Sequence, residues 1–239
     1  MKGKFLLSAY EISNEPNIYA DKSSLVLEWL LRVGLGREEF SIREVARDLE
    51  LSVGLVQKVF GVLVMHGHLQ AVGLRTAKKF TLKKPEPILM NWLEEYSIAK
   101  KCKMRPYRTG FQDREQMLRV LKTSKLKDKV VLALHSAAEA LSCKNTNLET
   151  LELYLLESGS RKAIETLLQL EPQERGYEVL LVEPYYKNLL QSALRVKQLK
   201  VTPVLLTFLD LYHFPLRGRE QAEYMAERTD VLKRIFTRR

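Results

Sequence analysis

Two closely spaced helix start signals in the segment Phe40–Lys84 constrain the fold more than any other feature of the chain. Ser41 is followed three residues later by Glu44, which is the spacing of a capping box. Ser52 follows shortly afterwards, and its hydroxyl can accept a free backbone N–H in the first turn of another helix. The spacing therefore predicts two helices joined by a tight turn.

A hairpin is predicted directly after the second helix. Gly67 marks the end of that helix, because glycine readily adopts the left-handed conformation that ends many helices. The runs 69–72 and 79–83 predict short strands around a tip at 73–78. Helices joined by a tight turn and followed by a hairpin are typical of a winged helix-turn-helix, and we predict such a domain for residues 1–85.

Each predicted helix has an apolar face and a face for solvent. On the first, Arg43 and Arg47 lie outside, and the apolar face contains Val45, Ala46 and Leu49. On the second, the helical spacing predicts a buried stripe made of Val56, Val59, Phe60, Leu63 and Val64. The opposite face is mostly short, polar or cationic and contains Ser52, Val53, Gly54, Gln57, Lys58 and Gly61.

This opposite face suits a helix that enters the major groove of DNA. No Asp or Glu occurs between Leu51 and Leu82, so no carboxylate there would repel phosphate. Basic residues in the hairpin can contact the phosphate backbone. We predict double-stranded operator DNA as the partner, with candidate contacts from Arg43, Arg47, Ser52, Gln57, Lys58, Arg75, Lys78 and Lys79. The alternatives are a small helical domain with a solvated basic face, or a protein-binding module.

The charge distribution also favours a polyanionic partner for the first half of the chain. The formal net charge is +10, and residues 102–129 alone hold nine Lys or Arg against three Asp or Glu. Residues 130–239 are nearly balanced. An excess of positive charge concentrated in one region favours nucleic acid, although the same charge also favours solubility.

Another helix is predicted before the helix pair. Its apolar face contains Val26, Trp29, Leu30 and Val33. Asp21 or Ser23 is expected to cap it, and Gly34 and Gly36 to end it. Residues 86–101 predict a connecting helix, with an apolar stripe of Leu89, Trp92, Leu93 and Tyr96.

Residues 102–239 alternate between strand and helix patterns, which predicts a mixed α/β domain and an α+β class for the chain. We expect Asp113, Ser136 and Ser160 each to begin a helix. Strands are expected near 102–111, 129–134, 148–156, 177–182 and 197–201. The basic strand at 102–111, with Tyr107, is either an edge strand protected by its charges or a second surface for nucleic acid.

Enzymatic chemistry has little support in the sequence. The residues around His135 and Ser136 loosely resemble the entrance of a nucleotidyltransferase site, which needs carboxylates on adjacent strands to bind Mg²⁺. Glu149 and Glu152 are three residues apart and so point to opposite faces of a strand, although Glu183 could join one of them. We predict no catalytic residues and no cofactor. A nucleotidyltransferase-like enzyme with a nucleic-acid-targeting domain is the alternative.

Metal binding, disulfides and membrane insertion are not expected either. His66 and His68 form an HxH without a further ligand nearby, so we expect polar residues at a helix end. Cys102 and Cys143 are too few for a disulfide framework and read as reduced thiols of a cytosolic protein. The first residues do not resemble a convincing signal peptide, and no apolar run approaches the roughly 18 residues of a membrane span.

Two segments of the second half resemble the AbiEi antitoxins of type IV toxin–antitoxin systems. The sequence VVLALHSAAEAL resembles that family's strand–turn–helix with paired alanines. The sequence VTPVLLTFLDLYHFPLRGREQAEYM resembles its closing region, in which a TP or SP pair precedes a helix and an RG turn leads into the last helix. The predicted N-terminal domain also matches that family.

The resemblance implies an autoregulatory antitoxin, or a solitary transcription regulator of the same build, in the bacterial cytoplasm at the nucleoid. The C-terminal domain at 102–239 would be distantly nucleotidyltransferase-like and would act on a cognate toxin or its substrate. A homodimer would place two such domains on two half-sites. Arg217, Gly218 and Arg219 could bind a phosphate or a partner's carboxylates, or pair with Glu220, Glu223 or Asp210 of the same chain.

Overall fold

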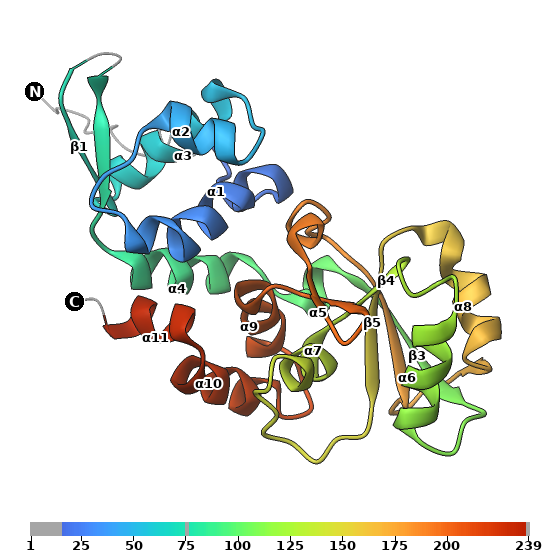
Figure 1. The fold of residues 1–239 in the computed structure, drawn as a ribbon. Helices are drawn as coiled ribbons and strands as arrows, with labels where there is room; N and C mark the ends of the chain where they lie inside the picture. Colours follow the sequence, from blue (N-terminus) through green and yellow to red (C-terminus); the bar gives the residue numbers. More distant parts are fainter. Residues whose placement is uncertain (1–15, 75–76, 238–239) are drawn as a thin grey trace, which may run out of the picture. The chain divides into compact units, whose positions relative to one another are not determined.

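The computed structural model of this 239-residue chain describes residues 16–74 and 77–237. The chain divides into two compact units, unit 1 ending at Lys84 and unit 2 beginning at Pro85. A two-stranded sheet belongs to unit 1 and a seven-stranded sheet to unit 2 (Figure 1). The predicted mixed α+β class is therefore confirmed. None of the described helices is long and apolar enough to cross a bilayer.

In the described part of unit 1, three α-helices precede an antiparallel hairpin. The elements are α1 (Asp21–Arg32), a short 3-10 helix η2 (Gly34–Gly36), α2 (Ile42–Asp48), α3 (Val53–Met65), β1 (Leu69–Val72) and β2 (Lys79–Leu82). In the hairpin, Leu69 pairs with Leu82 and Val72 with Lys79. The predicted positions of the paired helices and of both strands are confirmed.

The local signals that start α2 and α3 are present as expected. Ser41 accepts the N–H of Glu44 at 3.2 Å, and Glu44 accepts the N–H of Ser41 at 3.4 Å, which completes the capping box. Ser52 accepts the N–H of Leu55 at 3.3 Å. The helix α1 is present as predicted, but its predicted cap was wrong, because Ala20 and not Asp21 or Ser23 occupies the N-cap position, without a side-chain bond.

The end of α3 explains how the chain turns into the hairpin. Gly67 has a φ of +69°, and its N–H bonds to the carbonyl of Val64 at 3.0 Å. The N–H of His68 reaches the carbonyl of Leu63 at 2.8 Å, so the last turn forms a Schellman motif. A side chain at position 67 would strain this backbone, which is why glycine is required there.

A chain of four aromatic rings forms the centre of unit 1. Trp29, Phe40, Phe60 and Phe80 meet edge to face, with successive ring centroids 5.3, 5.8 and 4.8 Å apart. All four side chains are buried. Phe40 and Phe80 also exchange two backbone hydrogen bonds of 3.0 and 2.8 Å, which tie the start of α2 to β2. The core therefore fixes the hairpin relative to the helix pair.

The sheet of unit 2 is mixed, in the order β6-β3-β7-β5-β4-β9-β8. The pairs β5–β7 and β4–β9 are parallel, and the other neighbours are antiparallel. The strands are β3 (Lys103–Thr109), β4 (Val130–Leu132), β5 (Leu151–Leu155), β6 (Leu170–Pro172), β7 (Val179–Glu183), β8 (Leu194–Val196) and β9 (Leu199–Val201).

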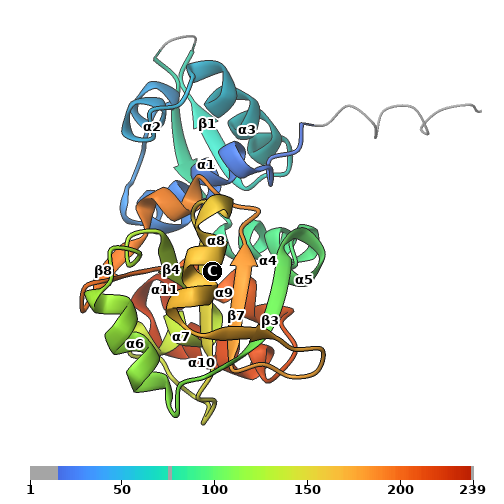
Figure 2. The ribbon, with the colours of Figure 1, turned by 90° about the vertical axis from the view of Figure 1, so that its right-hand side faces the viewer.

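Helices cover both faces of this sheet (Figure 2). Leu151, Leu153 and Leu155 of β5 share a core with α6 and α8, whereas Glu152 and Tyr154 contact α7 and α9 on the other face. All of β5 is therefore buried, although alternation had been expected. The helices are α4 (Pro85–Glu95), α5 (Ile98–Lys101), α6 (Arg114–Thr123), α7 (Leu134–Ala140), α8 (Arg161–Leu167), α9 (Val204–Tyr212), α10 (Gly218–Arg228) and α11 (Asp230–Thr237).

The structure corrects the interpretation of the basic strand as an edge strand, and it removes Tyr107 from the alternative, a surface for nucleic acid. β3 lies between β6 and β7, so it is not an edge strand. Tyr107 is buried and donates its hydroxyl to Glu165 at 2.6 Å, so it cannot face nucleic acid. Arg105 and Arg108 form ion pairs with Glu183 and Glu171 on the neighbouring strands.

The three residues expected to begin helices in unit 2 have different positions in the structure. Asp113 caps α6 by accepting the N–H of Gln116 at 2.8 Å, as predicted. Ser160 stands at the N-cap of α8 but makes no capping bond with its side chain. Ser136 lies inside α7 rather than at its cap, because the chain leaves β4 at once through Leu134, whose φ is +47°.

Candidate functional site

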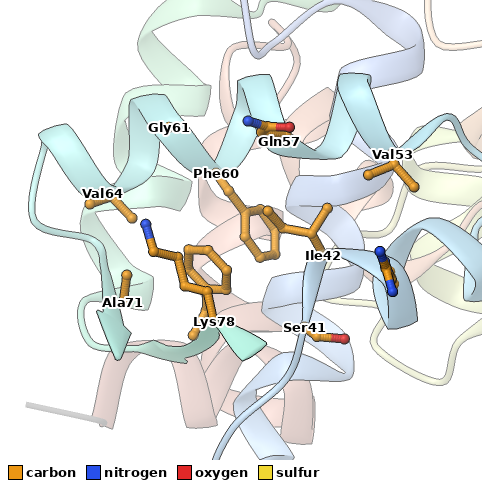
Figure 3. Close-up of a pocket in the computed structure, with 11 residues that line it drawn as sticks. Ser41, Ile42, Val53, Gln57, Phe60, Gly61, Val64, Ala71 and Lys78 are labelled. Carbon is orange, nitrogen blue, oxygen red and sulfur yellow. The ribbon is translucent and has the colours of Figure 1, made fainter. Parts of the chain in front are cut away.

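A groove of about 580 Å³ lies between the start of α2, the outer face of α3 and the hairpin of unit 1 (Figure 3). Residues from all three elements line it: Ser41, Ile42, Arg43, Val53, Gln57, Phe60, Gly61, Val64, Ala71, Lys78 and Phe80. In Figure 3 the side chain of Lys78 reaches from the hairpin toward α3 near Val64. The fold thus brings together three of the predicted contact residues, namely Arg43, Gln57 and Lys78.

One stripe of α3 forms a wall of the groove. Val53, Gln57, Gly61 and Val64 recur at helical spacing and line it, and all four are exposed to solvent. A side chain added at Gly61 would meet nothing within 4 Å. The outer face of α3 is therefore open and has no side chain at Gly61, so a partner can approach the helix backbone closely there.

The rim of the groove has more available positive than negative charge. Arg43 and Lys78, and the exposed Lys58 on α3, form no ion pair with any described residue. The carboxylates of Glu44 and Asp48, both on α2, pair with Arg37, at 3.9 Å in the case of Asp48. Free cations and neutralised carboxylates together favour an anionic partner.

The remaining predicted contact residues have other surroundings. Arg47 pairs with Asp48 at 3.5 Å, and Lys79 pairs with Glu39 at 3.5 Å. The hydroxyl of Ser52 serves as the cap of α3. These three and Lys58 do not line the groove. Arg75 lies outside the described residues.

Sequence reasoning placed Val53 correctly on the outer face of α3 but missed the other apolar residues of this surface. Val64 was predicted to be buried but is 36% exposed, whereas Val62 is buried in its place. Of eight exposed large apolar residues in the described part of the chain, five lie on α3 and the hairpin: Val53, Val64, Met65, Val72 and Leu74. Of these five, only Val53 and Val64 line the groove.

The HxH of unit 1 belongs to the connection between α3 and β1. The rings of His66 and His68 stack with centroids 6.0 Å apart. Burial, together with His66 and Lys84, lowers the pKa of His68, so its imidazole is neutral at pH 7. Among the residues that the structure describes, no three His, Cys, Asp or Glu side chains are placed to hold a metal ion.

The polar cluster around Ser136 in unit 2 is closed to solvent. The fully buried carboxylate of Glu152 accepts the N–H and the hydroxyl of Ser136 at 2.9 and 2.6 Å. It also accepts the hydroxyls of Thr150 and Tyr177. Glu149 is exposed, as expected for the opposite face. Glu152 is thus satisfied by hydrogen bonds within the fold, as buried polar groups usually are.

His135, next to this cluster, is also held by the fold. Burial lowers its pKa, and its Nε2 lies 3.1 Å from the carbonyl oxygen of Leu216. The neutral ring therefore carries its proton on Nε2 and donates it to that carbonyl. Close by, Arg217 pairs with Glu220 at 2.7 Å, and Arg219 pairs with Glu223 at 3.0 Å. Their charges are already compensated within α10.

Comparison of the chain with models of known families, with curated proteins and with solved structures gave no match.

Proposed function

We propose that unit 1 is a winged helix-turn-helix domain that binds double-stranded DNA, with α3 in the major groove and the hairpin against the backbone. One observation carries the proposal. The open stripe of α3 has no carboxylate and is flanked by Arg43 and Lys78, whose charges no described residue neutralises. A helix in the major groove needs such a face, and cations beside it reach the phosphates.

The side chains on this stripe favour A·T base pairs. Gln57 can donate to and accept from adenine through its amide in a bidentate pair. The methyl groups of Val53 and Val64 can contact the methyl group of thymine. No arginine occurs on α3, and its lysine, Lys58, does not line the groove, so neither usual partner for guanine lies on this stripe of the helix. We infer that the preferred half-site is rich in A·T steps.

Replacing Gln57 with Ala is expected to lower the preference for selected over scrambled DNA by about 1–3 kcal/mol, because one bidentate base contact is lost. The selected sequence would come from a random double-stranded library bound to the full chain. Binding to both DNAs would be measured by fluorescence anisotropy. Equal affinities of the variant and the parent chain for both DNAs would remove Gln57 from the interface.

A probe in which deoxyuridine replaces thymine tests the apolar contacts separately. It lacks only the thymine methyl groups, so the parent chain is expected to bind it more weakly. A variant with Val53→Ala and Val64→Ala should lose most of this difference, since it no longer has the contacting methyl groups. If the parent chain binds both probes equally, the valines do not read thymine, even where DNA binding itself is confirmed.

The unpaired cations are expected to act through phosphates. Neutralising Lys58 or Lys78 to Ala should weaken binding to every sequence similarly and lower the salt slope by about one unit each. Lys79→Ala is the matched control in the hairpin, because Lys79 already pairs with Glu39. A loss of affinity confined to one sequence would instead indicate a base contact.

For unit 2 we propose an effector or antitoxin role, which would make the whole chain a bacterial transcription regulator acting at the nucleoid. The resemblance of residues 130–141 and 201–225 to AbiEi antitoxins supports this role. Co-expression of the chain with the product of a neighbouring toxin gene would test it, with growth rescue as the expected result. The nucleotidyltransferase alternative predicts Mg²⁺-dependent turnover of nucleoside triphosphates. The buried, hydrogen-bonded Glu152 argues against it.

A further inference from the structure

Besides the groove of unit 1, the structure has a pocket of about 320 Å³ in unit 2, at one end of its sheet. It lies where the parallel strands β5 and β7 reach their carboxyl ends and where β3 begins. Ligands of open α/β sheets bind beyond the carboxyl ends of the strands. Its polar lining comes from Lys101, Lys103, Ser158, Glu183, Tyr185 and Lys187.

The positive charge of the three lysines that line this pocket is not neutralised by ion pairs with described residues. Lys101, Lys103 and Lys187 are exposed and form no ion pair with any residue in the described part of the chain. The carboxylate in the lining belongs to Glu183, which pairs with Arg105 at 3.0 Å. Like charges that share a pocket repel one another, and an anion between them would remove this repulsion.

The wall that carries two of these lysines is held by partly buried groups. The ammonium of Lys101 lies 5.5 Å from the centroid of the Tyr185 ring. Cys102, between the two lysines, accepts the backbone N–H of Tyr185 at 3.3 Å through its sulfur. Burial raises the pKa of Cys102 to about 11, so the thiol stays neutral and leaves the positive charge intact.

We propose that this pocket binds a small phosphate-bearing molecule through Lys101, Lys103 and Lys187. Lysine acts as a point charge toward phosphate and tolerates several geometries, which suits side chains that come from α5, β3 and the loop after β7. The volume lies near the lower end for small-molecule sites, so a compact ligand fits better than a long polymer. The proposal does not depend on DNA binding by unit 1.

Titration calorimetry of the full chain with pyrophosphate, at constant ionic strength, tests this proposal. We expect saturable binding with one pyrophosphate per chain. Lys103→Ala and Lys187→Ala should each weaken it about tenfold or more, as expected for a lost charged hydrogen bond. Lys103→Arg should retain most of the affinity. The matched control is Lys233→Ala, which removes an exposed lysine of α11 that forms no ion pair with a described residue.

Three results would overturn the assignment. The first is the absence of saturable binding by the parent chain. The second is an equal loss of affinity in the Lys233→Ala control. The third is tighter binding of a short single-stranded oligonucleotide than of pyrophosphate, lost with the same lysines, because the pocket would then serve a nucleic-acid backbone. Thermal melts of each variant would show that the fold is retained.

Discussion

Replacing Asp210 with Asn is expected to remove a large part of the pH dependence of unfolding between about pH 4 and pH 7. Asp210 lies on α9 and is fully buried. Its carboxylate accepts the hydroxyl of Tyr96 at 2.7 Å and that of Tyr154 at 2.9 Å. Burial raises the pKa of Asp210 to about 7, and the two tyrosine hydrogen bonds oppose this only in part.

The direction of the effect follows from proton binding. The folded chain keeps a proton on Asp210 up to about pH 7, whereas the unfolded chain releases it near the ordinary value of 3.8. The stabilising contribution is therefore complete below about pH 4 and is lost as the pH rises to about 7. A shift of this size corresponds to a free energy on the order of 4 kcal/mol. Asparagine cannot titrate and has no such slope.

Urea unfolding of the parent chain and of Asp210→Asn at several pH values would measure this difference. The stability of the parent chain relative to the variant should fall with rising pH and level off above about pH 7. Asp128→Asn is the control, because the hydrogen bond from Arg195 lowers the pKa of the exposed Asp128. Its contribution changes only in more acidic solution. Parallel curves for the parent and Asp210→Asn would contradict a protonated Asp210.

The surroundings of Asp210 could not be predicted from the sequence. From sequence alone, Asp210 was a candidate partner for Arg217 or Arg219. The structure instead buries it against Tyr96 and Tyr154, which are distant in sequence. No local pattern encodes such a contact, because it arises only when α4, β5 and α9 pack together.

Local signals, by contrast, predicted much of unit 1. The capping box at Ser41, the cap at Ser52 and the glycine stop at Gly67 are interactions between near neighbours, so the sequence contains them. The edges of the buried face of α3 could not be predicted in the same way. Tertiary packing, and not the helical period, decides that Val62 is buried and Val64 is exposed.

The candidate groove was predictable only in part. Arg43, Gln57 and Lys78 were expected on charge and polarity, and the fold does place them around one groove. Of its apolar lining, Val53 was expected on the outer face of α3, but Ile42 and Ala71 were not expected, because they carry no signal of their own. In unit 2, β4 and β9 were predicted, but β6 and β8, which are equally short, were missed. Neither β6 nor β8 contains a buried residue, so neither has an apolar run that would mark it as a strand.

Replacing Phe60 with Ala is expected to unfold much of unit 1 and to abolish sequence-selective DNA binding. Phe60 is buried at the centre of the aromatic chain, between Phe40 and Phe80, and also lines the groove. Removing a buried phenylalanine costs about 3–5 kcal/mol. A domain as small as unit 1 has a total stability of similar size.

Calorimetric melting of the full chain and DNA titration at two salt concentrations would test this outcome. The transition of unit 2 should remain, and pyrophosphate binding with it. Leu74→Ala is the control for stability. Leu74 is 83% exposed, so this substitution should change the free energy of unfolding by less than about 0.5 kcal/mol. Unchanged sequence preference in Phe60→Ala would show that unit 1 does not read DNA.

The DNA binding that remains after Phe60→Ala would report on the basic segment 102–129. Four of its nine cations, namely Arg105, Arg108, Arg114 and Lys129, already form ion pairs within unit 2. The charge available to phosphates is thus smaller than the composition implies. Residual binding should therefore be weak, salt-sensitive and equal for selected and scrambled DNA, because phosphate contacts carry no sequence information. Specificity would then belong to α3 and its groove.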